Sequence, residues 1–171
     1  NNTIDYTYAD YFISMWVWLG GAYTIVCLIR LVHEQASVIL VSNYLIGVCI
    51  LQCLLALAID NSPTFSQFVS RIVADLGFIE MDRLDDAGRL YGVGCCLDVA
   101  GTRFAAVLIL LAFTVCKISQ TTRQQHMWLY FVSFAIIVVI GNMISRTTTV
   151  GAVAAILIIA IYSITQKGKE S

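Results

Sequence analysis

Five long, mostly apolar stretches constrain the fold of this chain more than any other feature. A helix that spans a membrane needs about 20 mostly apolar residues, and each stretch has about that length. They predict spans over residues 11–29, 38–59, 98–116, 127–144 and 148–164. The chain is 59% hydrophobic and only 12% charged, whereas soluble domains carry about 25% charged residues. We therefore predict an all-α integral membrane fold, with residues 1–171 forming one transmembrane segment.

The last two predicted spans follow each other with almost no loop. From Gln124 to Gln166 the only charged residue is Arg146. One straight helix of that length would be about twice as long as the hydrocarbon core is thick, so the chain must turn. Turn-forming residues occur there only at positions 141–142 and 145–149. Arg146 is therefore predicted at a membrane surface, between two helices.

The loop over residues 60–97 contains a further predicted helix. Apolar residues recur at steps of three and four, which marks one face of a helix: Phe65, Phe68, Val69, Ile72, Val73 and Leu76. Ser62 with Pro63 is a start signal and Gly77 a stop signal. We predict an amphipathic helix over residues 63–76 that lies in the membrane interface.

Basic residues in the short loops predict which side of the membrane each loop faces. Basic side chains follow the first, third and fifth spans: Arg30 and His33, Lys117 and Arg123, Lys167 and Lys169. Such loops are normally cytoplasmic. The N-terminus, the loop at 60–97 and the turn at Arg146 are then external. An external N-terminus requires an earlier span, and the chain starts with Asn1 rather than Met, so we expect a segment of a longer protein.

Three arginines at the predicted external surface are the candidate binding residues: Arg89, Arg103 and Arg146. A guanidinium group offers a planar fork of donors that matches a phosphate, and it stays charged. Ionisable groups at membrane depth are expensive unless they are paired or serve a site. The alternative is that these side chains extend to the interface or pair with nearby acids.

Four other residues are candidates for a supporting role at this surface. Gly92 would let backbone amides approach an anion. Asp98 suits the N-cap of the third span better than catalysis. Ser145 adjoins Arg146 in the turn, and Gln52 lies inside the second span, where an amide usually bonds to a neighbouring helix. The chain's six cysteines and two distant histidines suggest no metal site, and we expect no cofactor and no nucleic acid as partner.

Three short motifs resemble, in their order, the O-antigen ligase/polymerase family. Ile50-Leu51-Gln52 is similar to the glutamine-containing helix end that precedes an external loop in that family. Arg89-Leu90-Tyr91-Gly92, followed by Leu97-Asp98, resembles its Arg-x-x-Gly and Asn-Pro-Asn element. Ile144-Ser145-Arg146-Thr147 resembles its Ser-Arg pair two helices later. The likeness covers roughly residues 40–165, with Cys96-Leu97-Asp98 in place of Asn-Pro-Asn and no counterpart for Arg103.

The resemblance implies metal-independent transfer of a glycan from a polyprenyl-diphosphate carrier to an acceptor glycan or glycolipid. The location would be the outer face of a bacterial inner membrane, in a multi-pass protein of lipopolysaccharide or other surface-polysaccharide assembly. Arg89 and Arg146 would bind the diphosphate and neutralise the charge that grows on the leaving group. The family's proposed catalytic residues lie in a large external loop outside this chain, and the isolated segment is expected to be inactive.

Two other functions fit the same composition. A transporter or flippase for a lipid-linked substrate would show broken helices near the midplane and inverted repeats, and the sequence shows no repeat. A purely structural membrane subunit would have all of its arginines extended to the interface.

Overall fold

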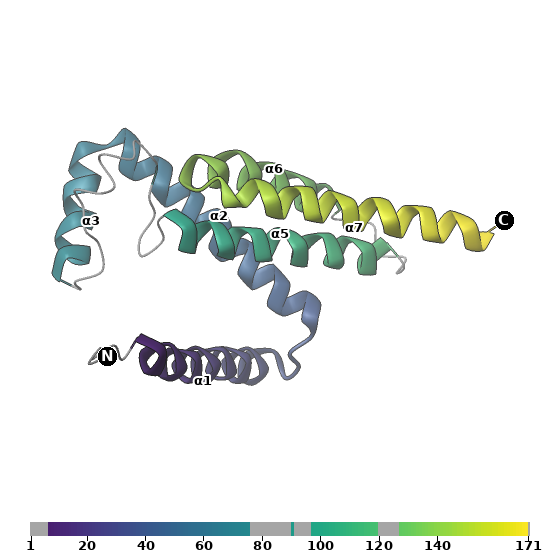
Figure 1. Ribbon diagram of the computed structural model, residues 1–171, viewed down its shortest axis with the longest axis horizontal. Helices are drawn as coiled ribbons and strands as arrows, with labels where there is room; N and C mark the ends of the chain where they lie inside the picture. The colour runs from purple at the N-terminus through teal and green to yellow at the C-terminus, as the bar shows by residue number, and fades with distance from the viewer. Residues whose placement is uncertain (1–6, 76–89, 91–96, 120–126, 171) are drawn as a thin grey trace, which may run out of the picture. The chain divides into compact units, whose positions relative to one another are not determined.

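The computed structural model describes residues 7–75, 90, 97–119 and 127–170 (Figure 1). Throughout this part, the regular elements are α-helices: α1 (Thr7–His33), α2 (Val38–Asn61), α3 (Pro63–Asp75), α5 (Leu97–Ser119), α6 (Met127–Ile144) and α7 (Thr147–Glu170). Among these, five helices are long and apolar enough to span a membrane. The protein is therefore an all-α, multi-pass membrane protein, which confirms the predicted fold class. Its chain divides into two compact units, Asn1–Val41 and Ser42–Ser171.

The first unit consists mainly of α1, whose described side chains are almost all exposed, with Ile29 buried. Apolar residues on every side suit a helix that contacts lipid along its length. The helix continues beyond the predicted end at residue 29, through Arg30 to His33. Glu34 follows with a φ of 60°, a left-handed conformation that commonly ends a helix.

From Ser42 onward, α2 belongs to the second unit and contributes one buried seam to it. Ser37 caps its start, because its Oγ accepts a hydrogen bond from the backbone N–H of Leu40 at 3.2 Å. The seam recurs at steps of three and four residues: Ser42, Ile46, Cys49, Cys53, Ala56 and Ile59. Four of them, Ile46, Cys49, Cys53 and Ala56, belong to the same apolar core as the buried side chains of α5, α6 and α7.

Helix α3 is the predicted amphipathic helix, and its bounds nearly coincide with the predicted residues 63–76. The Oγ of Ser62 accepts a hydrogen bond from the backbone N–H of Phe65 at 3.4 Å, so this serine caps the helix as expected. Phe65 and Val69 pack against Ile59 at the end of α2, whereas Phe68 is 60% exposed. The predicted stop at Gly77 lies outside the described residues.

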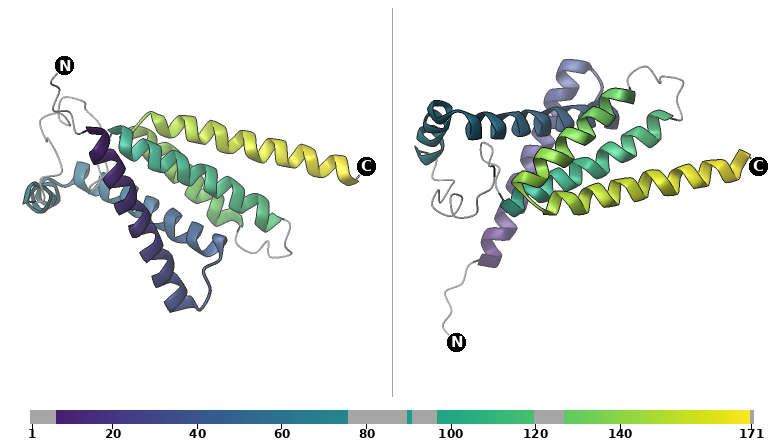
Figure 2. Two further views of the ribbon diagram at one scale, coloured as in Figure 1. Left: turned by 60° about the horizontal axis from the view of Figure 1, so that its bottom comes forward. Right: turned by 90° about the horizontal axis from the view of Figure 1, so that it is seen from above.

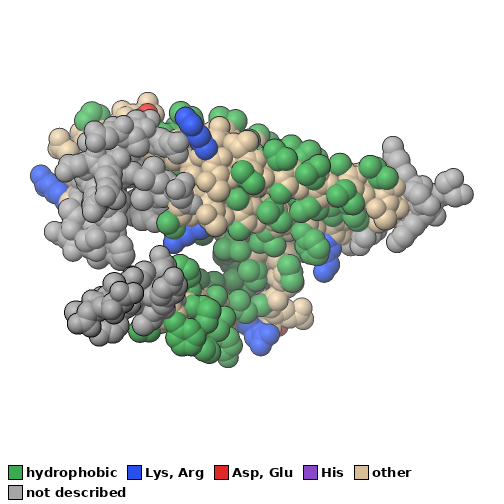
Figure 3. Space-filling model, viewed as in Figure 1, with side chains coloured by type: hydrophobic (Ala, Val, Ile, Leu, Met, Phe, Trp, Pro, Cys, Tyr) green, Lys and Arg blue, Asp and Glu red, His purple; other side chains and the backbone are tan. Residues whose placement is uncertain are grey.

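Helix α5 is the central element of the second unit, with α6 and α7 beside it (Figure 2). Its fully buried side chains form the middle of the core: Ala100, Phe104, Leu108, Leu111 and Ala112. Helices α5 and α7 run in the same direction and α6 runs against them (Figure 1). On the face drawn in Figure 3, hydrophobic side chains are spread over these three helices among backbone and other atoms, as suits a lipid environment.

A hydrogen bond between side chains joins the starts of α2 and α6. The hydroxyl of Tyr130 donates to Oδ1 of Asn43 at 2.8 Å. Both residues lie within the first turns of their helices, so these two helices begin at the same end of the bundle. Which end of the bundle faces the outside stays a prediction from the short basic loops.

Candidate functional site

The turn between α6 and α7 consists of Ser145 and Arg146 alone. Gly141 and Asn142, the other predicted turn-forming residues, lie inside α6. The backbone N–H of Ser145 still bonds to the carbonyl of Gly141 at 2.8 Å, so α6 ends with regular helical geometry. Arg146 is exposed between the two helix ends, as the absence of other charges in this stretch predicted.

Backbone amides at the start of α7 are already bonded within the turn. The N–H of Thr147 donates to Ser145 Oγ at 3.4 Å, that of Thr148 to the Ser145 carbonyl at 3.2 Å, and that of Thr149 to the Arg146 carbonyl at 3.0 Å. A helix N-terminus binds anions through such amides. Because these three are occupied, an anion at this turn would depend on the side chain of Arg146.

Threonine hydroxyls tie the two helices together across the turn. Thr148 Oγ1 donates to the carbonyl of Gly141 at 3.0 Å, and both residues are buried. Thr149 Oγ1 donates to Asn142 Oδ1 at 2.8 Å in an exposed position. Hydroxyl groups in such a turn can bind a phosphate or stabilise the turn itself. Both hydroxyls donate to groups of the preceding helix, as expected if they stabilise the turn.

The start of α5 packs directly against this turn. A Cβ placed on Gly101 would collide with Ser145 Oγ, and would lie 2.8 Å from both Ser145 Cβ and Thr147 Cβ. Ser145 is fully buried in this contact. The structure therefore brings together two segments that lie far apart in sequence, the beginning of the third predicted span and the Ser-Arg turn.

A second close contact lies one turn further along the same two helices. A Cβ on Gly151 of α7 would collide with Cα of Ala105 of α5 and lie 2.9 Å from its carbonyl oxygen. Gly101 and Ala105 are four residues apart in α5, as are Gly151 and Ala155 in α7. Such small residues at a spacing of four let helix backbones approach closely inside membranes.

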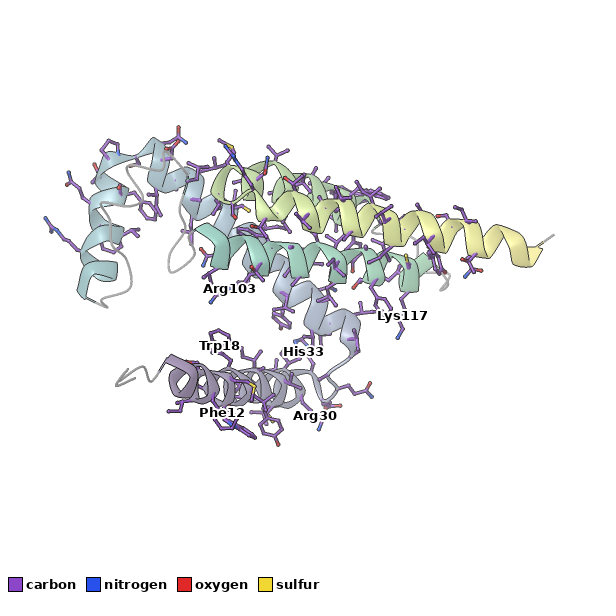
Figure 4. All side chains as sticks on the ribbon, in the orientation of Figure 1. Phe12, Trp18, Arg30, His33, Arg103 and Lys117 are labelled. Carbon is purple, nitrogen blue, oxygen red and sulfur yellow. The ribbon has the colours of Figure 1, made fainter. Side chains whose placement is uncertain are left out.

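The candidate arginines do not form one described cluster. Arg103 is exposed near the start of α5 (Figure 4). It is two residues from Gly101, which is about 200° around the helix, so it lies on the side of α5 opposite the turn. Arg146 and Arg103 thus lie at the same end of the bundle but on different sides of it. Arg89 and Gly92 lie outside the described residues, whereas Leu90 between them is buried in the core.

Helix α5 is described from Leu97 onward, and residues 91–96 lie outside the described residues. The role of Asp98 as an N-cap therefore stays a prediction. A carboxylate in the first turn still stabilises the helix through the macrodipole. The side chain of Asp98 itself is outside the described set.

Gln52 occupies a half-buried position in α2, next to the buried seam. Its side-chain oxygen Oε1 is buried and receives no hydrogen bond, although the residue takes part in another polar interaction.

Cavities occur toward the other end of the bundle. One groove of about 560 Å³ lies between α5 and α7 near Lys117. A second cavity of about 270 Å³ lies among α5, α6 and α7 near Tyr130 and Phe134. Both are far along the helices from Arg103 and Arg146, so neither is a pocket for a ligand held by these arginines.

Sequence reasoning missed the residues that assemble this end of the bundle. They are Gly101, Gly141, Gly151 and the buried hydroxyl of Thr148. The signal was present, because two Gly-x-x-x-Ala patterns in parallel helices are typical of close helix pairs. The bond between Tyr130 and Asn43 had no comparable signal, since nothing in a single sequence pairs residues so far apart.

Within the described ranges, no three His, Cys, Asp or Glu side chains lie close enough together to hold a metal ion. Comparisons with other proteins add no assignment: no family model, no curated protein and no solved structure matches the chain.

Proposed function

We propose that this chain is the membrane-embedded segment of a glycosyltransferase similar to the O-antigen ligases and polymerases. In this proposal it binds a glycan linked to a polyprenyl diphosphate at the outer surface of a bacterial inner membrane. The acceptor is a glycan or glycolipid. The lipid bilayer is the environment of all five apolar helices.

One observation carries the proposal: the contact of Gly101 with Ser145 and Thr147. The resemblance rests on motifs separated in sequence, one opening α5 and one at the Ser145–Arg146 turn. A shared binding surface requires the two motifs to adjoin. The packing of the start of α5 on the turn supports this requirement, and the burial of Leu90 beside Arg89 in sequence agrees with it.

Arg146 is the residue through which this end of the bundle would bind the diphosphate. Its guanidinium group is exposed where lipid headgroups would lie, while the amides around it are occupied by the turn. A fork of donors can hold two oxygens of a diphosphate and neutralise the charge that develops as the glycan leaves. Arg89 would act from the other motif. Arg103, on the far side of α5, would contribute only through its charge.

The proposal is tested by polysaccharide production in cells that carry the full-length protein. Arg146→Ala and Arg89→Ala should each abolish ligated or polymerised product, and Arg146→Lys should also be strongly reduced because an ammonium cannot replace the fork. Arg71→Ala, which removes an exposed charge from α3, is the matched control and should leave production intact. Normal product from Arg146→Ala, at wild-type protein levels, would refute the assignment.

Within the helices described here, each of the five apolar elements runs without an interruption. A transporter would be expected to have broken helices near its substrate. No described feature therefore favours the transport function over glycosyl transfer.

A further inference from the structure

Helices α5 and α7 are in close contact only over the first part of their length. From the contact of Gly151 with Ala105 the two helices diverge toward their C-terminal ends, as both views in Figure 2 show. The divergence opens the groove of about 560 Å³. Its walls are apolar: Phe113 and Cys116 from α5, Ile158 and Ile161 from α7. A space of this size and chemistry in a membrane is filled by hydrocarbon and not by water.

Among the described lining residues, the polar groups gather at one end of the groove. Lys117 lies near the end of α5, at the opposite end of that helix from Arg103 (Figure 4). Tyr162 and Thr165 of α7 complete this end. The hydroxyl of Tyr162 accepts a hydrogen bond from Gln166 Nε2 at 2.9 Å, so its own proton can be donated elsewhere. The exposed ammonium of Lys117 has three N–H groups and can serve more than one acceptor.

We propose that this groove binds one anionic phospholipid, with an acyl chain along its apolar walls and the phosphate at Lys117 and Tyr162. Among the described residues that line the groove, Lys117 is the one that carries a charge, and this positive charge is complementary to a negative headgroup. The same charge disfavours a second copy of this chain, because a symmetric contact through the groove would bring two Lys117 side chains together. Basic pockets between membrane helices bind anionic headgroups in this way. The proposal does not depend on the proposed function.

The test measures which lipids stay bound to the purified chain by native mass spectrometry. The protein is extracted from vesicles that contain phosphatidylglycerol and phosphatidylcholine in equal amounts. Wild type should retain phosphatidylglycerol over phosphatidylcholine by about fivefold, the contribution expected of one basic side chain at an anionic headgroup. Lys117→Gln should lose this preference and still retain lipid. Arg71→Gln, which removes an exposed charge from α3 outside the groove, should keep it.

A second variant tests the apolar part of the site separately from its charge. Ile161→Trp places a larger side chain in the groove and should lower the retention of both lipids. Val153→Trp makes the same kind of change at an exposed position of α7 outside the groove and should retain lipid as wild type does. Helix content measured by circular dichroism identifies any variant that fails to fold. If Ile161→Trp does not fold, the lipid preference of Lys117→Gln alone tests the proposal.

Three results would overturn the proposal. They are equal retention of the two lipids by wild type, an unchanged preference in Lys117→Gln, and wild-type retention in folded Ile161→Trp. A concentration-dependent dimer that loses its lipid as it forms would instead assign the groove to a second copy of the chain.

Discussion

Glycine is the residue that allows α5, α6 and α7 to lie as close together as they do. At Gly101 the missing Cβ leaves room for the buried Ser145, and at Gly151 it leaves room for the backbone of Ala105. A Cβ placed on Gly141 would lie 3.0 Å from Thr148 Cγ2. In a lipid environment such close contacts replace the hydrophobic effect as the source of helix association.

Gly151→Ala should destabilise the second unit, because the added methyl would meet backbone atoms of Ala105 that cannot move independently of α5. Overpacking of this kind costs about 1–3 kcal/mol. Gly47→Ala is the matched control, since nothing lies within 4 Å of a Cβ at that position of α2. The free energy of unfolding in mixed detergent should fall for Gly151→Ala alone. Equal stability of the two variants would mean that α5 and α7 are not in backbone contact.

Thr148→Val should remove a buried hydrogen bond while preserving the shape of the side chain. The hydroxyl of Thr148 bonds to Gly141 in the preceding helix, and bonds between membrane helices contribute about 0.6 kcal/mol on average and up to about 1.7 kcal/mol. Thr165→Val is the control, because that hydroxyl donates to the Ile161 carbonyl of its own helix at 2.8 Å. The same unfolding measurement should show a larger loss for Thr148→Val. A larger loss for Thr165→Val would contradict the role given to the turn.

At the scale of the elements, hydropathy alone predicted most of the fold. The predicted spans at 38–59 and 127–144 nearly coincide with α2 and α6, because charged or polar residues flank both apolar runs. Helix α1 runs past its predicted end because Arg30 does not stop a helix: hydropathy marks the hydrocarbon boundary and not the last hydrogen-bonded residue. Gly141 and Asn142 stayed helical because the residues around them bond in the regular pattern, which overrides their turn preference.

Helix α3 should lie in the membrane interface with Phe68 in contact with lipid. Phe65 and Val69 pack against Ile59, so among the described side chains of this face Phe68 is the large apolar one that is exposed. A spin label at Phe68→Cys should collide more often with oxygen, which dissolves in lipid, than with a water-soluble nickel complex. A label at Gln67→Cys, exposed on the polar side, should show the reverse. Water-like accessibility of both labels would place α3 away from the membrane.

At the scale of the whole molecule, the fold packs together segments that are far apart in sequence, which no single helix could predict. The sequence placed Arg103 and Arg146 at one surface, and the packing of Gly101 on Ser145 brings their helices together there. The sequence could not show that Arg103 lies on the side of α5 opposite the turn. Two residues at the same membrane depth can lie on any side of their helices, because depth does not fix the rotation of a helix about its axis. Arg89 and Gly92 lie outside the described residues, so their part in the site stays a prediction.

The orientation of the chain is testable through two loop residues in a variant without native cysteines. Arg83→Cys should react with a membrane-impermeant maleimide added from outside, and Arg123→Cys should react only after the membrane is permeabilised, because short basic loops face the cytoplasm. The reverse labelling pattern would invert the orientation. It would also move Arg146 to the cytoplasmic surface and exclude the proposed outer-surface site.

The central claim is that Arg146, at the α6–α7 turn, binds the diphosphate of a lipid-linked donor. The most direct measurement is the equilibrium binding of a short-chain polyprenyl diphosphate to the full-length protein in vesicles. Arg146→Ala should weaken this affinity by about tenfold or more, the loss expected for a hydrogen bond to a charged group. Arg103→Ala should weaken it less, and Arg71→Ala should leave it unchanged. Wild-type affinity in Arg146→Ala would contradict the claim.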